Sequence, residues 1–368
     1  MNGSEVLLNL AGAVALLLWA TRMVRTGVER AYGDRLRRSL SGILGNPLAA
    51  MLVGLLLAVA LQSSTAVGLL VGSFAGSGIV TGAAGVLSVF GAYVGSALMV
   101  KLLSYDLSLL MPICVLSGTT MFLVTERREW RQLGRIIVGV GLLLLSLRLI
   151  ADATEPLRDS RILPVIVQYL SGDPVTAFLL AGIITWLFHS SVAAILLMAA
   201  LAARGLMPAE LGLVMMLGSN LGGSLVAAVL TRNSAPPTRI VPLASLIVRG
   251  PAAVVGLAVL VVLPLPLHFL GADPATRIIN AHILFNCLVA VLGAPFAAAI
   301  HRAAARIVLA TTTASAAAAG APAEDASALD ETALKHPAQA LANATREVVR
   351  ICETVETMLT QVIELYER

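Results

Sequence analysis

Long uncharged apolar runs are the feature that most constrains this chain. Residues 211–230 and 278–300 contain no Asp, Glu, Lys or Arg, and a helix of about 20 such residues crosses the ~30 Å hydrocarbon layer of a bilayer. Largely apolar runs also occupy 6–20, 109–124, 136–150 and 240–263. With 58% hydrophobic and 12% charged residues, the chain has more apolar surface than a soluble core can bury. We predict an all-α, polytopic membrane protein.

The placement of basic residues predicts the orientation, because Lys and Arg concentrate in cytoplasmic loops. Six arginines lie in 22–38, after the first run, and four lie in 127–135. By contrast, 104–108 has no basic residue and 152–173 is net acidic. Successive loops must lie on alternate sides of the membrane. This requires seven crossings of the plasma (inner) membrane, with the N-terminus outside and the C-terminus in the cytoplasm.

An internal repeat emerges at a constant offset of 127 residues, the difference between positions 12 and 139. Its matches favour glycine and serine over the common apolar residues, which indicates a duplication. The matched pairs include Gly12 and Gly139, Pro47 and Pro174, Ser63-Ser64 and Ser190-Ser191, Gly91 and Gly218, and Gly95 and Gly222. We place the first repeat at about 5–104, the second at 132–231 and closing spans at 238–302, all within a transport domain of 1–305.

Each repeat contains a broken apolar segment. The runs 48–61 and 175–188 are too short to cross a bilayer comfortably, and each is followed at once by another short run, 66–75 or 193–203. We predict two re-entrant helical hairpins. Because the first span begins outside and its copy begins inside, the two repeats have inverted topology.

The hairpin tips are polar. Gln62, Ser63, Ser64 and Thr65 form the first tip, and His189, Ser190 and Ser191 form the second. A break at membrane depth is expected where it lines protein or a water-filled cavity, and a helix starting there points free N–H groups at an anion. Free carbonyl groups at the preceding helix ends suit sodium. The alternative is structural, with serines bonding to their own helix or allowing close helix approach.

Three motifs resemble the type II sodium/phosphate cotransporter family. They are Gln62-Ser63-Ser64-Thr65-Ala66, Gly218-Ser219-Asn220-Leu221-Gly222 and Ala281-His282-Ile283-Leu284-Phe285-Asn286. The resemblance covers about 5–305 and implies phosphate and sodium sites at the two tips. The candidate substrate-binding residues are Gln62, Ser63, Ser64, Thr65, His189, Ser190, Ser191 and Asn220. The candidate sodium ligands are Gln62, Ser64, Thr65, Ser191 and Asn220, with sodium as the co-transported ion and no cofactor.

The sequence departs from the family pattern at three positions. His189 stands where Gln is usual, Val192 where a hydroxyl residue is common, and Tyr93 where an Asn would fall. Each change removes a neutral oxygen that could bind sodium. Proton coupling through His189 therefore stays an alternative, because histidine side chains change charge near neutral pH.

Four further residues are supporting candidates: Ser219, Arg249, His282 and Asn286. An arginine inside a span is functional by default, but Gly250 and Pro251 follow it, so Arg249 could instead lie at a helix break and reach the membrane interface. His282 and Asn286 are four residues apart, on one helix face. We expect them to form a structural hydrogen-bonded pair near the site.

The C-terminal part changes in character. Residues 306–330 are rich in Ala, Thr, Gly and Pro, which predicts a flexible linker. Residues 331–368 carry apolar side chains at helical spacing, which predicts a cytosolic amphipathic helix that resembles the start of a PhoU-like domain. A single such helix is expected to dock on the membrane domain, to form a homodimer, to bind a cytosolic regulatory partner, or to be a truncation remnant.

The motifs of zinc peptidases and phosphate-loop ATPases are absent, so the sequence predicts a transporter and not an enzyme. The expected activity is sodium-coupled symport of inorganic phosphate across the plasma membrane by alternating access. The expected partners are phosphate, sodium and the lipid bilayer, with no nucleic acid. The alternatives are a non-transporting membrane scaffold or phosphate sensor, and a transporter of the same fold that carries another oxyanion or couples to protons.

Overall fold

The computed structural model describes residues 3–43, 46–105, 107, 109–156, 162–263, 266–318 and 337–366. Every regular element in these ranges is a helix, which confirms the predicted all-α class. The chain forms two compact units, Met1–Ala310 and Thr311–Arg368. Six helices in the described ranges are long and apolar enough to cross a membrane, and a bent pair of shorter helices would make a seventh. The protein is therefore a multi-pass membrane protein.

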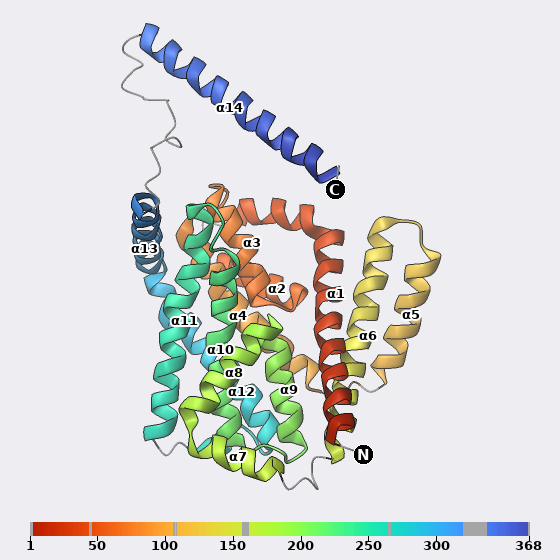
Figure 1. Ribbon diagram of the computed structural model, residues 1–368. Helices are drawn as coiled ribbons and strands as arrows, with labels where there is room; N and C mark the ends of the chain where they lie inside the picture. The colour runs from red at the N-terminus through yellow and green to blue at the C-terminus, as the bar shows by residue number, and fades with distance from the viewer. Residues whose placement is uncertain are drawn as a thin grey trace. The chain divides into compact units, whose positions relative to one another are not determined.

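The helices α1 to α13 follow one another along the chain with short connections (Figure 1). Their bounds are α1 (Gly3–Ile43), α2 (Pro47–Leu61), α3 (Ser64–Gly76), α4 (Gly82–Leu103), α5 (Leu110–Val124), α6 (Arg128–Thr154), α7 (Ile162–Gly172), α8 (Pro174–Phe188), α9 (Ser191–Ala203), α10 (Ala209–Leu230), α11 (Pro236–Val262), α12 (Pro274–Gly293) and α13 (Ala297–Ala318). Short 3₁₀ helices η2 (Leu267–Leu270) and η3 (Ala294–Phe296) flank α12.

Three successive helices of each half have the same lengths. α2 and α8 have 15 residues, α3 and α9 have 13, and α4 and α10 have 22. Each pair begins at positions separated by the offset found in the sequence. The correspondence extends to packing, because a Cβ added to Gly91 of α4 would overlap the carbonyl oxygen of Met51, and one added to Gly218 of α10 would overlap that of Phe178. In both halves, glycine allows the third helix to pack closely against the first.

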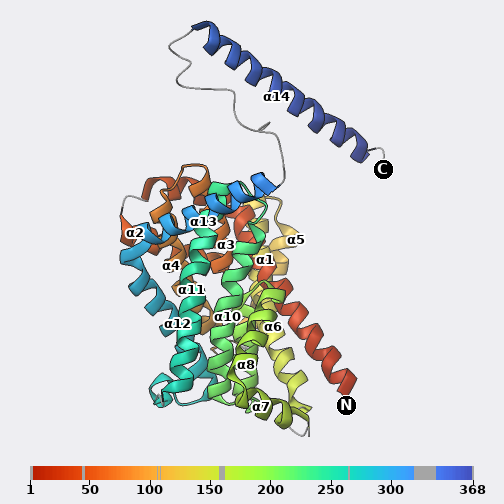
Figure 2. The ribbon, with the colours of Figure 1, turned by 60° about the vertical axis from the view of Figure 1, so that its left-hand side comes forward.

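The first helices of the two halves, α1 and α6, pack against each other in opposite directions. A Cβ on Gly27 would contact Ile136, whereas one on Gly139 would contact Val24. Residue numbers therefore increase along α6 in the direction in which they decrease along α1. Two views place α3 toward one end of the first unit and α7 toward the other, which is the end where α1 begins (Figures 1 and 2). Antiparallel packing of equivalent helices is the arrangement that an inverted repeat produces.

Two features of the first half differ from expectation. The predicted basic loop after the first span is helical, because α1 continues through Arg22, Arg25 and Arg30, which arginine's high helix propensity favours. The expected crossing at 109–124 is α5, a helix of 15 residues that falls short of the six spanning helices. It packs on α6 where Gly118 and Gly134 bring the two backbones together.

The predicted linker is helical at its start. α13 continues to Ala318, in keeping with the strong helix propensity of its alanines, and 319–336 lie outside the described residues. The amphipathic segment forms α14 (Pro337–Tyr366) in the second unit. Its apolar residues Val348, Ile351 and Met358 are exposed there.

Candidate functional site

The two hairpin tips are built alike. Gln62 ends α2 and His189 ends α8, and both have a φ angle of 52°. Residues other than glycine seldom adopt this left-handed backbone conformation. The next residue caps the following helix: the Oγ of Ser63 accepts from the N–H of Ala66 at 3.1 Å, and the Oγ of Ser190 accepts from the N–H of Ala193 at 3.2 Å. Each tip therefore turns the chain abruptly and presents the N-terminus of a helix.

The tips share a cavity with α1. Its volume is about 560 Å³, and it is lined by Gln62 and Ser63 from the first tip and by His189 and Ser190 from the second. Its remaining lining residues are Ala15, Leu18, Trp19, Thr21, Arg22, Arg25 and Phe188. The structure thus brings the two predicted tips together across a single space, and adds two cations to it.

Arg22 and Arg25 were not predicted as site residues. Their position after the first apolar run indicated a cytoplasmic loop, but both lie on α1 and face the tips. Their spacing of three residues places them on one helix face, and this was the sequence signal that could have identified them.

Three other tip residues lie behind the cavity. Ser64, Thr65 and Ser191 are buried and do not line it. The Oγ1 of Thr65 donates to the carbonyl oxygen of Gly223 at 3.4 Å. A Cβ on Gly223 would lie 3.6 Å from the Oγ of Ser191 and 3.8 Å from a terminal nitrogen of Arg249. Gly223 of α10 therefore joins both tips to a buried arginine.

Arg249 is the centre of a buried polar network. Its side chain is 1% exposed, and one terminal nitrogen donates to the Oδ1 of Asn220 and, at 3.0 Å, to the Oδ1 of Asn286. The amide nitrogens of both asparagines lie 3.2 Å from Nδ1 of His282. The alternative in which Arg249 reaches the membrane interface is wrong, because α11 continues through Pro251 and the side chain of Arg249 is buried.

Tyr93 covers the other side of the guanidinium. Its ring centroid lies 4.2 Å from Cζ of Arg249, a cation–π distance. Its hydroxyl is hydrogen-bonded to the Oγ of Ser245 and donates to the carbonyl oxygen of the same residue at 3.4 Å. Arg249 is therefore fixed from three helices, α4, α10 and α12, in addition to its own.

The predicted site residues thus fall into two groups. Gln62, Ser63, His189 and Ser190 line the cavity, whereas Asn220, Arg249, His282 and Asn286 form the buried network, with Ser64, Thr65 and Ser191 between the two. Ser219 belongs to neither group. Its Oγ accepts from the Oγ1 of Thr185 at 2.8 Å and so links α8 to α10.

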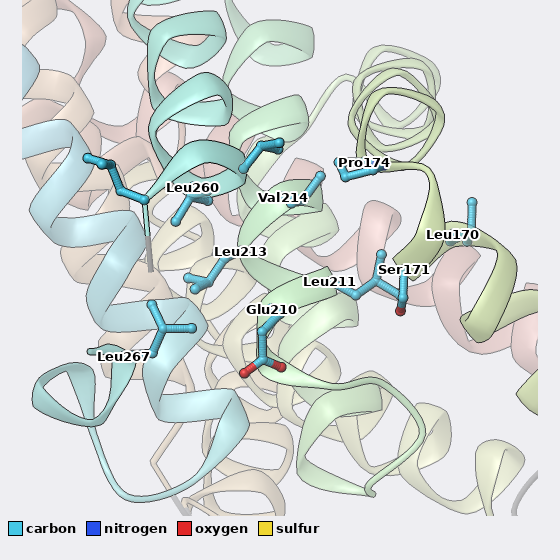
Figure 3. A pocket seen from close by; sticks show the side chains of 11 residues that line it. Leu170, Ser171, Pro174, Glu210, Leu211, Leu213, Val214, Leu260 and Leu267 are labelled. Carbon is cyan, nitrogen blue, oxygen red and sulfur yellow. The ribbon is translucent and has the colours of Figure 1, made fainter. Parts of the chain in front are cut away.

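Another cavity, of about 400 Å³, is walled mainly by apolar side chains of α7, α8, α10 and α11 (Figure 3). Its lining includes one carboxylate, that of Glu210, and no Lys or Arg. A carboxylate repels an oxyanion, so this cavity is a poor candidate for anion binding.

The comparisons with known proteins identify the family. Residues 16–152 and 159–292 match the family described as Na+/Pi-cotransporter. The chain is 35% identical over 357 residues to a Salmonella typhimurium protein, and 34% identical over the same length to an Escherichia coli K12 protein. Both are named "Putative inorganic phosphate export protein YjbB". A Bacillus subtilis protein, "Uncharacterized protein YqeW", is 21% identical over 297 residues, which cover 81% of this chain and 96% of that protein.

The aligned region covers 96% of this chain but 64% of each YjbB protein. No solved structure matches the chain. The family match extends through both hairpins and the buried network and confirms the resemblance drawn from the three motifs. The chain is a multi-pass membrane protein that belongs to the Na+/Pi-cotransporter family.

Proposed function

We propose that this protein carries inorganic phosphate across the plasma membrane, with the anion bound between the two hairpin tips. The observation that supports this most strongly is the cavity in which Ser63, Ser190, Arg22 and Arg25 meet. Family membership and the names of the YjbB relatives point to the same substrate.

The chemistry of the tips suits a phosphate oxygen. Each capping serine uses its oxygen to accept from a helix N–H, so its own O–H remains able to donate. The N-termini of α3 and α9 add the positive ends of two helix dipoles. The guanidinium groups of Arg22 and Arg25 supply charge and paired donors.

We also propose that sodium is co-transported, with its ligands among Gln62, Ser64, Thr65 and Ser191. The Oε1 of Gln62 is buried and has no hydrogen-bond partner. Burying such an oxygen costs folding free energy unless a hydrogen-bond donor or a cation binds to it. Hard cations prefer oxygen ligands. The orientation proposed is N-terminus outside and C-terminus in the cytoplasm, with the two hairpins as inverted repeats that open the site alternately to each side.

The test is transport by the purified full chain in liposomes. Labelled phosphate is added outside, with an inward sodium gradient, an equal sodium concentration on both sides, or choline in place of sodium. The proposal predicts saturable phosphate uptake that the inward gradient accelerates. Saturable uptake that ignores the gradient contradicts the coupling, whereas a folded protein without phosphate flux under any of the three conditions contradicts the transport function.

The second candidate is phosphate efflux, which the names of the YjbB relatives favour. Liposomes loaded with labelled phosphate and diluted into phosphate-free buffer test it. Because a carrier works in both directions and the imposed gradients decide the net flux, the two candidates are separated in cells. If the protein takes up phosphate, a strain that overproduces it should contain more phosphate. If the protein exports phosphate, the same strain should contain less.

A further inference from the structure

A further cavity lies between α1, α5 and α6. Its volume is about 320 Å³, which is within the range of small-molecule sites. In the view of Figure 1, α5 is the outermost helix on its side of the first unit, and α6 packs against both α5 and α1. The cavity is lined by Met23 of α1, Thr119 and Phe122 of α5, and Arg135 and Val138 of α6. A single cation therefore lines an otherwise largely apolar space, at a place where lipid surrounds the protein.

The guanidinium of Arg135 lacks a partner for one of its N–H groups. Among the described residues, none accepts a hydrogen bond from its Nε, although this atom is buried. The acidic residues nearest to it along the chain, Glu129 and Glu126, do not line the cavity. A buried donor without an acceptor costs folding free energy, and a charged side chain at membrane depth marks a functional site by default. Arg135 therefore calls for an anion that comes from outside the protein.

The residues before Arg135 place the cavity just inside the membrane surface. Trp130 is 49% exposed, and tryptophans of spanning helices concentrate at the level of the lipid headgroups. Arg131 is also exposed, and its Cζ lies 4.9 Å from the ring centroid of Phe122. Arg135 follows about one helical turn further into the apolar part of α6. A phospholipid presents its phosphate at this depth, with its acyl chains continuing inward.

We propose that this cavity binds one anionic phospholipid. Its phosphate oxygens accept from the Nε and a terminal nitrogen of Arg135, the paired geometry that a guanidinium group provides. Part of an acyl chain fills the space between Met23, Phe122 and Val138. Basic pockets between spanning helices recognise anionic headgroups in this way.

The charges favour an anionic over a zwitterionic lipid. Arg131 and Arg135 both lie at the headgroup end of the cavity, and they repel the ammonium group of a zwitterionic headgroup. The site shares no lining residue with the cavity between the hairpin tips. Lipid binding here is therefore separate from the binding of transported phosphate.

The experiment measures binding of single lipid molecules to the purified full chain by native mass spectrometry. Phosphatidylglycerol and phosphatidylcholine with identical acyl chains are titrated separately into the protein in detergent. We expect the first phosphatidylglycerol to bind about tenfold more tightly than the first phosphatidylcholine, because only its headgroup carries a net charge that the arginines attract. Millimolar ammonium phosphate should not displace the bound lipid, because free phosphate has no acyl chain to fill the apolar part of the cavity.

Arg135→Leu removes the cation, and Arg135→Lys retains a charge. The preference for phosphatidylglycerol is expected to disappear in Arg135→Leu and to persist in part in Arg135→Lys. Arg148→Leu is the matched control, since Arg148 is an exposed arginine of α6 that does not line this cavity, and its preference should equal that of the wild type. Val138→Phe occupies the space of the acyl chain without changing the charge, so it should weaken binding of phosphatidylglycerol.

Four results would overturn the proposal. They are equal binding of the two lipids by the wild type, an unchanged preference in folded Arg135→Leu, equal losses in Arg135→Leu and Arg148→Leu, and displacement of the lipid by phosphate alone. If Arg135→Leu fails to fold, the wild-type preference and the Val138→Phe variant decide the matter. Because the measurement involves no transport, its failure would leave the proposed phosphate transport standing.

Discussion

Tyr93 and Asn220 occupy equivalent positions in the two repeats, and both side chains contact Arg249. The ring of Tyr93 lies against the guanidinium, and the amide oxygen of Asn220 accepts a hydrogen bond from it. One arginine is thus held between two residues that are related by the 127-residue offset of the sequence matches. The two matched segments meet at a charged centre, and the difference between Tyr93 and Asn220 makes that centre asymmetric.

Tyr93→Phe is expected to lower the free energy of unfolding by about 1 kcal/mol, because it removes the hydrogen bond to Ser245 but keeps the ring on Arg249. Ser245→Ala breaks the same side-chain contact. Since both substitutions remove the same hydrogen bond, the double variant should be only slightly less stable than either single variant. Thermal unfolding in detergent measures this, and fully additive losses would contradict the contact.

Gly91→Ala and Gly218→Ala are expected to destabilise the protein by similar amounts, about 1–3 kcal/mol each. The added methyl group would overlap a backbone carbonyl of α2 in the first case and of α8 in the second. A carbonyl group within a helix cannot rotate away from the overlap. Gly12→Ala is the matched control, because nothing lies within 4 Å of its added Cβ and alanine favours a helix. Thermal stability of the three variants, compared in one detergent, gives the result. Unequal losses at 91 and 218 would speak against equivalent packing in the two halves.

Ser63→Ala and Ser190→Ala are each expected to reduce phosphate flux, because each removes a hydroxyl donor and the cap of a helix, which contributes about 1 kcal/mol. Ser63→Thr and Ser190→Thr keep the hydroxyl and should retain more flux. The amount of folded protein is measured in parallel by gel filtration. Normal flux in both alanine variants would mean that the tips are structural.

Arg22→Gln and Arg25→Gln are expected to weaken phosphate binding, by roughly threefold to tenfold each, because a charged donor is replaced by a neutral one. Arg30→Gln is the control on the same helix, since Arg30 is exposed and does not line the cavity. The half-saturating phosphate concentration of uptake measures the effect. Equal values for all three variants would exclude Arg22 and Arg25 from the site.

The sequence predicted the elements whose signals are local. The polar breaks at Gln62 and His189, the glycines of the repeat and the pairing of His282 with Asn286 all follow from short-range patterns, and the structure has each of them. The equal helix lengths in the two halves follow from an alignment without gaps.

Other parts depended on contacts that no local pattern encodes. Arg22 and Arg25 were placed in a loop because arginine clusters usually mark the cytoplasmic side, yet here α1 continues and carries them to the tips. The burial of Arg249 could not be foreseen, because its partners Tyr93, Asn220 and Asn286 come from three other helices. Gly250 and Pro251 suggested a break that the packed helix does not have.

An experimental structure of the full chain in saturating phosphate tests the central claim most directly. The account predicts anion density between Ser63 and Ser190, within hydrogen-bond reach of their hydroxyl groups and facing Arg22 and Arg25. Phosphate bound elsewhere, with the cavity between the tips filled only by water in a protein that transports phosphate, would contradict it.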